Sequence, residues 1–473
     1  MIEKNMTLAW RNLWRNRRRT LITAASVFFA VLFAVVMRSL QLGSYGTMFR
    51  NAIESYSGYI QIQQEDYWEN KTVDNTFPYE PGLREQLTSD KNVLETIPRF
   101  ESFALASSGP TTRGVMVMGI HPEKEQHLSK VSEKLVKYRL TPDAVQAIRA
   151  EPQIPDKVKE LLDLYESHSY TGTKRLQLDL KIDDDDAEDL MPVILQHARF
   201  DNGHIQLGEP GAWVGEKLSR YLELEIGDSI VLIGQGYHAS TAAGKYAIRG
   251  IVKMPLPDID NRIVYLPLDV CQDLYNAGDN LTAISLHVDD NGDKAVSATV
   301  SRLEKVLAGQ LRVLDWKEMN EVLVSQLDAD NKSGMIMIGI LYLVIAFGVF
   351  GTVLMMTAER RREFGVLVAI GMQKRKLASI VTSEIFMMGL LGILGGCMAA
   401  LPIILYGMEH PIVFKGEFAR IWEDYGFEPV MSFQGIDTYF LWQVVIVAVM
   451  VVIALGHPLS KIFRLKVVNA LRA

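Results

Sequence analysis

Residues 333–358, SGMIMIGILYLVIAFGVFGTVLMMTA, decide the fold because 26 consecutive residues carry no charge. Twelve of them are Leu, Ile, Val or Phe. At about 0.3–0.6 kcal/mol each, these side chains favour insertion into a bilayer by about 4–7 kcal/mol in total. A buried helix of a soluble protein rarely continues this far without a charge, so the stretch predicts a transmembrane helix.

Three further uncharged runs, residues 21–37, 385–408 and 438–456, predict three more membrane helices. The first run follows a basic head and is short enough for a signal peptide. Its end, Met37-Arg38-Ser39, is a poor cleavage site, so we expect an uncleaved anchor. The sequence therefore predicts four spans.

Charge asymmetry predicts the orientation of these spans. Residues 1–19, 358–378 and 456–473 together hold sixteen basic and three acidic residues, whereas the rest of the chain holds 33 basic and 53 acidic residues. The positive-inside rule then places both termini in the cytoplasm and the long segment between the first two spans outside. The net charge of −7 argues against nucleic acid as a partner.

We thus expect an α+β membrane protein with four transmembrane helices and a large α+β extracytoplasmic domain between the first and the second. The expected segments, in chain order, are a cytoplasmic amphipathic helix (1–19), the first span (20–42), the extracytoplasmic domain (43–332) with an insertion near 137–192, the second span (333–358), a cytoplasmic coupling segment (359–377), the third span (378–408), an outer loop (409–437), the fourth span (438–456) and a cytoplasmic tail (457–473).

The expected outer domain mixes strands and helices. Alternating and β-branched residues predict strands at 58–63, 114–120, 229–233, 246–252, 262–266 and 283–288. Helices are expected at 213–222, 293–307 and around 155–167. The run Asp183–Asp186 reads as a solvated acidic loop and not as a calcium site, because the EF-hand glycine and distal glutamate are absent.

Two cytoplasmic stretches have unusual patterns. Leu8–Arg15 has amphipathic helical spacing, which suits either a plain interfacial anchor or a helix that also braces a partner. In residues 357–377 two basic clusters flank a short apolar segment. Positive-inside topology explains the arginines, but the apolar side chains between them indicate a surface for a partner protein.

Glu384 stands early in the third span, where a carboxylate at mid-membrane would cost about 2.5–3.5 kcal/mol. Its position close to Lys376 favours interfacial pairing or helix capping over transport chemistry. A stripe of small residues follows it and predicts close helix packing: Gly389, Gly392, Gly395 and Gly396.

Enzymatic motifs are missing from the sequence. Residues 239–246, ASTAAGKY, lack the first glycine and the final hydroxyl of a phosphate-binding loop. There is no GxSxG elbow, no metal-ligand spacing among the histidines, and only two cysteines. We expect a non-catalytic chain without a cofactor of its own.

Three segments together resemble the FtsX-like permeases of ABC transporters: AWRNLWRNRRRTLIT (9–23), ERRREFGVLVAIGMQKRKL (359–377) and HPLSKIFRLKVVNALRA (457–473). Four spans without a fused ATPase are most similar to the LolC/LolE lipoprotein-releasing type. The related MacB type carries its own nucleotide-binding domain, and the FtsX division proteins have a much smaller outer domain. The insertion near 137–192 looks longer than the family's usual connection.

The resemblance implies a bacterial inner-membrane protein that works with a second permease copy or a paralogue. A separate, dimeric ABC ATPase would bind ATP and magnesium and would seat on the coupling segment. The implied coupling residues are Arg361, Arg362, Glu363, Phe364, Gly365, Gly371 and Lys374.

One lipoprotein-releasing permease has a carrier-binding hairpin that would fall at residues 234–246 of this chain. The candidate docking residues there are Gly236, Tyr237, Ser240 and Thr241, and a simple surface hairpin remains the alternative. A periplasmic carrier or adaptor would be the partner.

The function implied by the resemblance is mechanotransmission: ATP hydrolysis in the partner drives the extraction of lipoproteins or other lipid-linked cargo from the membrane. Two alternatives stay open. One is an efflux or peptide-export permease of the same layout, and the other is a transmembrane signalling scaffold that controls a periplasmic enzyme.

Overall fold

The computed structural model describes residue 10, residues 13–14, 17–307, 309, 311–414, 418, 421–422 and 429–466. The chain divides into a helical unit, from residues 1–47, 322–415 and 429–473, and an α+β unit, from residues 48–321 and 416–428. Most of the expected amphipathic helix 1–19, the middle of the expected loop 409–437 and the tail from residue 467 lie outside the described residues.

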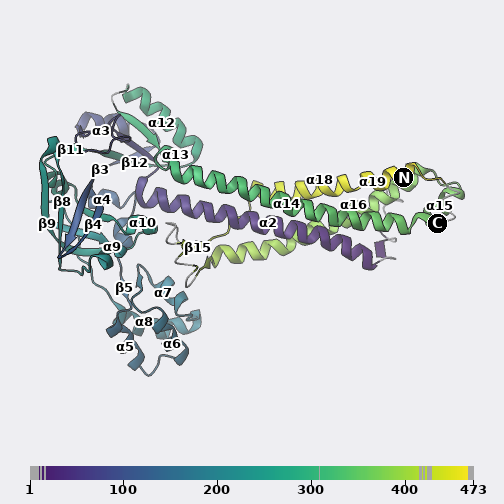
Figure 1. Cartoon of the computed structure of the whole chain (residues 1–473), viewed down its shortest axis with the longest axis horizontal. Coiled ribbons are helices and arrows are strands. Elements are labelled where there is room, and N and C mark those ends of the chain that lie inside the picture. Colours follow the sequence, from purple (N-terminus) through teal and green to yellow (C-terminus); the bar gives the residue numbers. More distant parts are fainter. Residues whose placement is uncertain are drawn as a thin grey trace. The chain divides into compact units, whose positions relative to one another are not determined.

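Four long helices dominate the helical unit (Figure 1), and each is long and apolar enough to cross a membrane. They are α2 (Arg17–Ala52), α14 (Glu321–Glu359), α16 (Lys374–Glu409) and α18 (Thr438–Ala454). Short α15 (Arg361–Ala369) and α19 (Gly456–Phe463) accompany them, as does the strand pair β14 (Ile412–Val413) and β15 (Val430–Met431). Helices α2 and α14 extend well beyond the uncharged runs, because backbone hydrogen bonding does not stop where apolar residues do.

Glycines allow three of the long helices to pack closely. A Cβ atom added to Gly392 of α16 would lie 2.6 Å from the carbonyl oxygen of Ala24 on α2. One added to Gly389 would lie 2.9 Å from a methyl group of Val451 on α18. The predicted small-residue stripe therefore does bring α16 against both neighbours.

Helix α14 is much less covered than the other three long helices. Only 11% of its most apolar window is buried, against 33% in each of the others. Large side chains such as Ile336, Ile340 and Phe347 are more than half exposed. The other described helices of this unit therefore leave most of the apolar surface of α14 uncovered.

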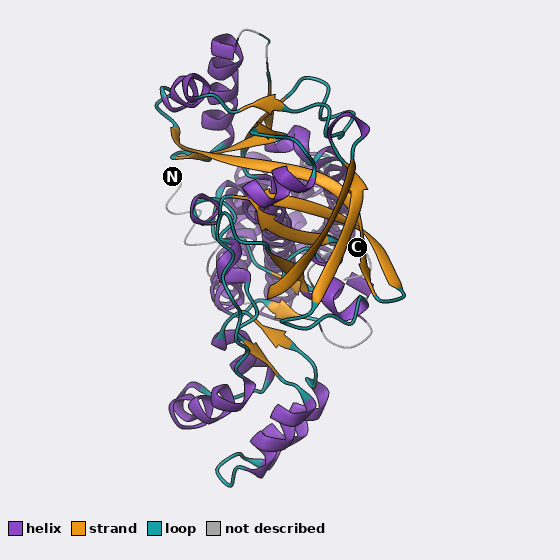
Figure 2. Cartoon of the chain, turned by 90° about the vertical axis from the view of Figure 1, so that its left-hand side faces the viewer, coloured by secondary structure: helices purple, strands orange, loops and turns teal. Residues whose placement is uncertain are grey.

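The α+β unit is built on a nine-stranded sheet of order β13-β1-β12-β3-β4-β10-β7-β9-β8, drawn in orange in Figure 2. Because β8 also pairs with β3, the last six strands close into a barrel. The strands are β1 (Ile60–Gln63), β3 (Val93–Ser108), β4 (Thr111–Ile120), β7 (Gly211–Gly215), β8 (Ser229–Gln235), β9 (Thr241–Val252), β10 (Ile263–Pro267), β12 (Ala283–Val288) and β13 (Arg312–Asp315).

Buried apolar side chains fill the barrel, among them Phe100, Leu232 and Val264. Short helices cover the sheet: α3 (Pro81–Thr88), α4 (Pro122–Glu125), α9 (Glu216–Tyr221), α10 (Pro257–Asp260), α11 (Leu268–Leu274), α12 (Asp293–Leu307) and α13 (Trp316–Met319). The remaining short elements are η1 (Ile53–Ser57), η2 (Val131–Lys134), η3 (Tyr237–Ala239) and the strand pair β2 (Phe77–Pro78) and β11 (Asn280–Leu281).

All six predicted strands are present, but one predicted helix at the sheet needs correction, and β3, β7 and β13 were not predicted as strands. The expected helix 213–222 begins as strand β7, since Trp213 and Val214 pair with β10, and only α9 is helical. The longest strand, β3, was not predicted, because Pro98, Arg99 and Glu101 interrupt its apolar pattern.

The insertion is a separate helical lobe, seen at the bottom of Figure 2. It contains α5 (Pro142–Ala150), α6 (Asp156–Leu164), α7 (Thr173–Asp179) and α8 (Asp184–Ala198). The pair β5 (Tyr138–Arg139) and β6 (Ser169–Tyr170) joins the start of the lobe to its middle, and a β-bridge between Tyr138 and Arg199 joins its two ends. It has its own apolar core, which includes Ile148, Leu162 and Ile194. The expected acidic loop is wrong: Asp184–Asp186 form the first turn of α8, where the helix dipole favours negative charge.

Candidate coupling site

The coupling segment is a helical hairpin at one end of the helical unit. Helix α14 ends at Glu359, α15 occupies the next nine residues, and α16 begins at Lys374. The connecting turn uses Gly371 with a φ of +102°, a conformation that residues with a Cβ atom rarely adopt. No atom lies within 4 Å of the position of its missing Cβ, so the backbone conformation and not crowding requires glycine here.

Arg360 stands at the break between α14 and α15, and its side chain is only 9% exposed. Its guanidinium donates to Glu384 of α16, which is 2% exposed, and Nε lies 3.3 Å from a carboxylate oxygen of Glu363. The same guanidinium lies over the ring of Phe364, 5.2 Å from its centroid. One arginine thus ties the end of α14 and the start of α15 to α16.

Burial makes the Arg360–Glu384 pair sensitive to change. Two charges removed from water repay their desolvation only while both partners remain, and loss of one partner typically costs about 3–5 kcal/mol. Glu384 was expected to pair near an interface, and the structure supplies the partner. Arg360 was not among the predicted site residues. The sequence did hold a signal for it, because a carboxylate such as Glu384 in an apolar segment needs a partner, and the three arginines at 360–362 precede the third span.

The predicted coupling residues divide into an exposed and a buried set. Arg361, Arg362 and Glu363 are exposed on α15, whereas Phe364 is 2% exposed and Gly365 is also buried. Phe364 packs into the apolar core of the helical unit. The buried set therefore fixes α15, and the exposed set is available for contact.

Two apolar side chains complete the exposed surface of α15. Val366 is 40% and Ile370 is 80% exposed. We call the exposed residues Arg361, Arg362, Glu363, Val366 and Ile370 the α15 surface. Val366 and Ile370 are therefore accessible beside the charged residues of this helix.

Lys374 lies apart from the α15 surface. Its Nζ donates to the main-chain oxygen of Phe463, the last residue of α19, at 3.1 Å. A cation at the carboxyl end of a helix satisfies a free carbonyl group and complements the helix dipole. Lys374 therefore joins the start of α16 to the helix that follows α18.

The second candidate site, the tip of the β8–β9 hairpin, belongs to the α+β unit. Gly236 is buried, Tyr237 and Ser240 are half-buried, and Thr241 is exposed. The amide of Gly236 donates to the carbonyl oxygen of Ser240 at 2.8 Å, which closes the turn. The side chain of Thr241 is thus the most accessible of the four.

Neighbouring segments hold this tip in place. The amide of Tyr237 donates to the main-chain oxygen of Tyr275 at 2.8 Å, and the amide of His238 donates to Asp74 at 2.7 Å. The side chain of Asn276 donates to Ser240 Oγ at 3.1 Å. The hairpin is therefore a fixed surface feature of the barrel, and its role in docking remains a prediction.

Among the described residues, no group of three or more His, Cys, Asp or Glu side chains is placed to hold a metal ion. The segment that resembled a phosphate loop runs into strand β9, where Tyr246 is buried.

Comparison with known protein families gives a match for the C-terminal part of the chain. Residues 335–467, which contain most of α14 and all of α15, α16, α18 and α19, match the family described as FtsX-like permease C-terminal. None of the curated proteins matches the chain.

Two solved structures are similar to this chain, both with low sequence identity and a low TM-score. The periplasmic region of MacB from Actinobacillus actinomycetemcomitans is 8% identical with a TM-score of 0.30, and the match covers 58% of this chain and 95% of that one. The extracellular domain of YknZ, an ABC-type transporter from Gram-positive bacteria, is 8% identical with a TM-score of 0.27, covering 54% and 98%.

Four apolar helices, with an α+β unit between the first and the second, define a multi-pass membrane protein. Over residues 335–467 the chain is similar to the FtsX-like permeases, which are membrane subunits of ABC transporters.

Proposed function

We propose that this permease couples ATP hydrolysis by a separate ATPase dimer to the extraction of lipoproteins or other lipid-linked cargo from the bacterial inner membrane. The observation that carries the coupling is the α15 surface, where exposed apolar and charged side chains sit on a helix anchored by the buried Arg360–Glu384 pair. A helix whose buried side is held in place and whose other side is exposed is suited to receive force from a partner protein.

The connectivity of the chain supplies a route for that force. Helix α14 is continuous for 39 residues, which corresponds to about 58 Å. It begins shortly after strand β13 of the sheet and helix α13, and it ends at Glu359, next to Arg360. Movement of α15 would be passed through Arg360 to the end of α14 and through Glu384 to α16.

The ATPase would act by biasing two conformations of the permease. A ligand or partner shifts such an equilibrium only as far as it binds one conformation better than the other. ATP and magnesium would be held entirely by the ATPase subunits. In this chain, the α15 surface would bind the ATPase more tightly in one conformation of the permease than in the other.

Orientation and partners follow from charge and exposure. The basic segments around α15 and at both termini would lie in the cytoplasm, and the α+β unit would lie in the periplasm. The large uncovered apolar surface of α14 would contact lipid and a second permease copy or paralogue. The hairpin tip around Thr241 would be the docking point for a periplasmic carrier.

Replacement of Ile370 tests the coupling role. Ile370→Asp places a charge on the α15 surface without touching the buried pair, whereas Glu363→Arg would disturb Arg360 as well. We expect at least about a tenfold loss of co-purified ATPase, corresponding to about 1.4 kcal/mol. Leu164→Asp on α6 is the matched control, because Leu164 is 64% exposed and lies in the helical lobe.

Mass spectrometry of the protein purified from native membranes in mild detergent tests the cargo. An ATPase together with acylated lipoproteins would support lipoprotein release, and deletion should then leave lipoproteins in the inner membrane. An ATPase with an adaptor, or with a periplasmic enzyme and no acylated cargo, would replace the proposal by export or by signalling.

A further inference from the structure

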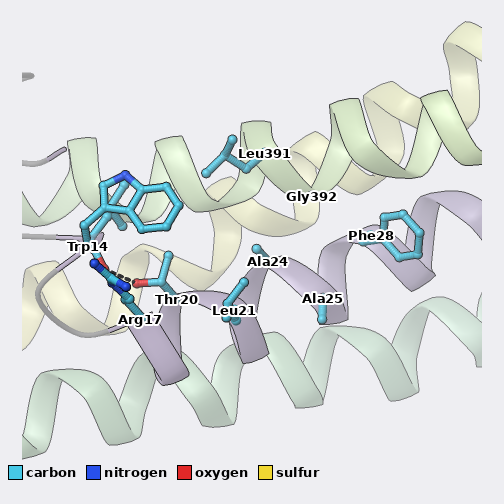
Figure 3. A pocket seen from close by; sticks show the side chains of 10 residues that line it. Trp14, Arg17, Thr20, Leu21, Ala24, Ala25, Phe28, Leu391 and Gly392 are labelled. Carbon is cyan, nitrogen blue, oxygen red and sulfur yellow. Dashed lines mark hydrogen bonds between the residues drawn. The ribbon is translucent and has the colours of Figure 1, made fainter.

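A cavity of about 350 Å³ lies in the helical unit where the segment before α2 meets α2 and α16 (Figure 3). Its lining runs along α2 from Arg17 to Phe28, and Leu391 and Gly392 of α16 close the other side. Small side chains at Ala24 and Ala25 leave the space open. The cavity is distinct from both the α15 surface and the hairpin tip.

The wall of the cavity is apolar along almost its whole length. Of the described lining residues, only Arg17 is charged, and the Thr20 hydroxyl is occupied by donating to the main-chain oxygen of Leu13 at 2.8 Å. A water-soluble polar ligand would find almost no hydrogen-bond partners inside. An apolar chain could enter without leaving a polar group of its own unpaired.

The cationic end of the cavity is built by Arg17, the first residue of α2, and by Trp14 before it. Leu13 is buried in the core of the helical unit, which fixes the neighbouring Trp14 at the mouth. The Arg17 guanidinium lies 5.9 Å from the centre of the Trp14 ring, and both side chains are exposed. Tryptophan beside arginine is typical of the headgroup level of a bilayer, where arginine meets anionic phosphates.

The length of the cavity matches one leaflet. Arg17 and Phe28 are eleven residues apart on a continuous helix, which corresponds to about 16 Å. Half of a hydrocarbon core of about 30 Å is about 15 Å. A headgroup at Arg17 would therefore place its acyl chain along α2 as far as the bilayer midplane.

The cavity is also accessible from the side. Leu21 is 63% and Leu391 is 42% exposed, although both line it, so a lipid could enter laterally. The volume lies at the lower end of the range for ligand pockets. It therefore accommodates one acyl chain and leaves the second chain of a phospholipid in the bilayer.

We propose that this cavity binds one acyl chain of an anionic phospholipid, whose phosphate is paired with Arg17. The bound lipid fills the gap between α2 and α16 and fixes the position of the segment around Trp14. This site does not depend on the cargo, because it lies at the start of α2, where Arg17 and Arg18 stand, and shares no residue with the α15 surface or the hairpin tip.

Retention of defined lipids by the purified full-length protein tests the site. The protein is equilibrated in nanodiscs with equal amounts of phosphatidylglycerol and phosphatidylcholine of identical chains, transferred to detergent, and its retained lipids are counted by native mass spectrometry. We expect phosphatidylglycerol to be preferred. Arg17→Gln should reduce that preference about fivefold, the factor that corresponds to one arginine near an anionic surface.

Two matched controls separate the cavity from general attraction of lipid to a basic segment. Arg18→Gln removes the same charge one residue along, from an exposed side chain outside the cavity lining, and should leave the preference unchanged. Ala25→Phe should fill the cavity and abolish retention of the lipid, whereas Ile22→Phe adds bulk to an exposed position outside the lining and should not.

Equal effects of Arg17→Gln and Arg18→Gln would overturn the proposal, as would full retention in Ala25→Phe. An unchanged melting temperature of Ala25→Phe in detergent excludes misfolding as the cause of its loss. Should that variant prove unstable, the comparison of the two arginine variants decides alone. ATPase co-purification should stay normal in Arg17→Gln, so failure of this site and failure of the coupling role are distinguishable.

Discussion

The helical unit and the α+β unit each bury an arginine against a glutamate. In the α+β unit Arg99 of β3 is 1% exposed and Glu125 of α4 is 0% exposed, and the pair is bidentate at 2.5 and 3.2 Å. In the helical unit Arg360 and Glu384 are 9% and 2% exposed. The chemistry is the same, but the surroundings differ.

Their positions in the chain give the two pairs different meanings. Arg99 lies within a continuous 16-residue strand and also donates to the main-chain oxygen of Tyr56. It therefore joins β3 to α4 and to η1. Arg360 lies at a break between two helices, beneath the exposed α15 surface. Arg99 thus stabilises a continuous strand, whereas Arg360 stabilises the junction of two helices.

The largest loss of stability is expected from Arg99→Met, because Glu125 would remain wholly buried without its partner. We expect the free energy of unfolding to fall by about 3–5 kcal/mol. The double variant Arg99→Met/Glu125→Leu should recover most of this loss, since no charge is left buried. Thermal unfolding of the purified protein in detergent measures both, and a double variant no better than the single one would contradict the assignment.

A smaller loss, of about 3 kcal/mol, is expected from Arg360→Met, because this pair is slightly more exposed. The double variant Arg360→Met/Glu384→Leu should regain stability but not the coupling of ATP hydrolysis to transport. Hydrolysis and cargo release in reconstituted vesicles measure that coupling. Normal transport by the stable double variant would show that this pair is as purely structural as Arg99–Glu125.

Asp260 provides the third and smallest effect, because backbone amides and not an arginine meet its charge. It accepts from the amides of Met254 and Lys217 at 2.8 Å and of Glu216 at 3.2 Å. Burial raises the pKa of Asp260 from 3.8 to about 6, although these amides oppose the shift. The folded protein therefore holds this proton more tightly than the unfolded chain does.

The pH dependence follows from that difference. Below about pH 4 the carboxyl is protonated in both states; as the pH rises to about 6, the unfolded chain releases the proton first, so stability falls by about 2–3 kcal/mol. Asp260→Asn should lack this decline. Unfolding of both proteins measured from pH 4 to 7 checks it, and parallel curves would mean that Asp260 titrates normally.

Hydropathy and charge predicted the helices well, because membrane insertion depends on the local sum of apolar side chains. Six strands of the nine-stranded sheet were also predicted; β7 and β13 were missed, and so was the longest strand, β3. In the sequence, Arg99 and Glu101 of β3 look like surface residues. Arg99 can be buried because it pairs with Glu125, which lies 26 positions after it in the chain. The prediction of an acidic loop at Asp183–Asp186 was wrong because a run of aspartates is as compatible with the start of a helix as with a loop.

The candidate site was predicted in outline but not in detail. The sequence marked the basic and apolar residues around α15, yet three adjacent arginines at 360–362 look alike in it. Only the break after Glu359 turns Arg360 inward and leaves Arg361 and Arg362 exposed. Likewise, the cavity beside Arg17 depends on small residues from two helices separated by more than 360 positions.

The number of apolar helices, the clustering of positive charge and the α+β character of the segment between the first two long helices could all be predicted from the amino-acid sequence, because each depends on neighbouring residues or on simple periodicity. The tertiary structure alone decided which charges are paired, which side chains of α15 are exposed and where α2 and α16 leave a gap. These depend on distances between residues far apart in the chain, and desolvation makes an energetic difference only once those residues have met.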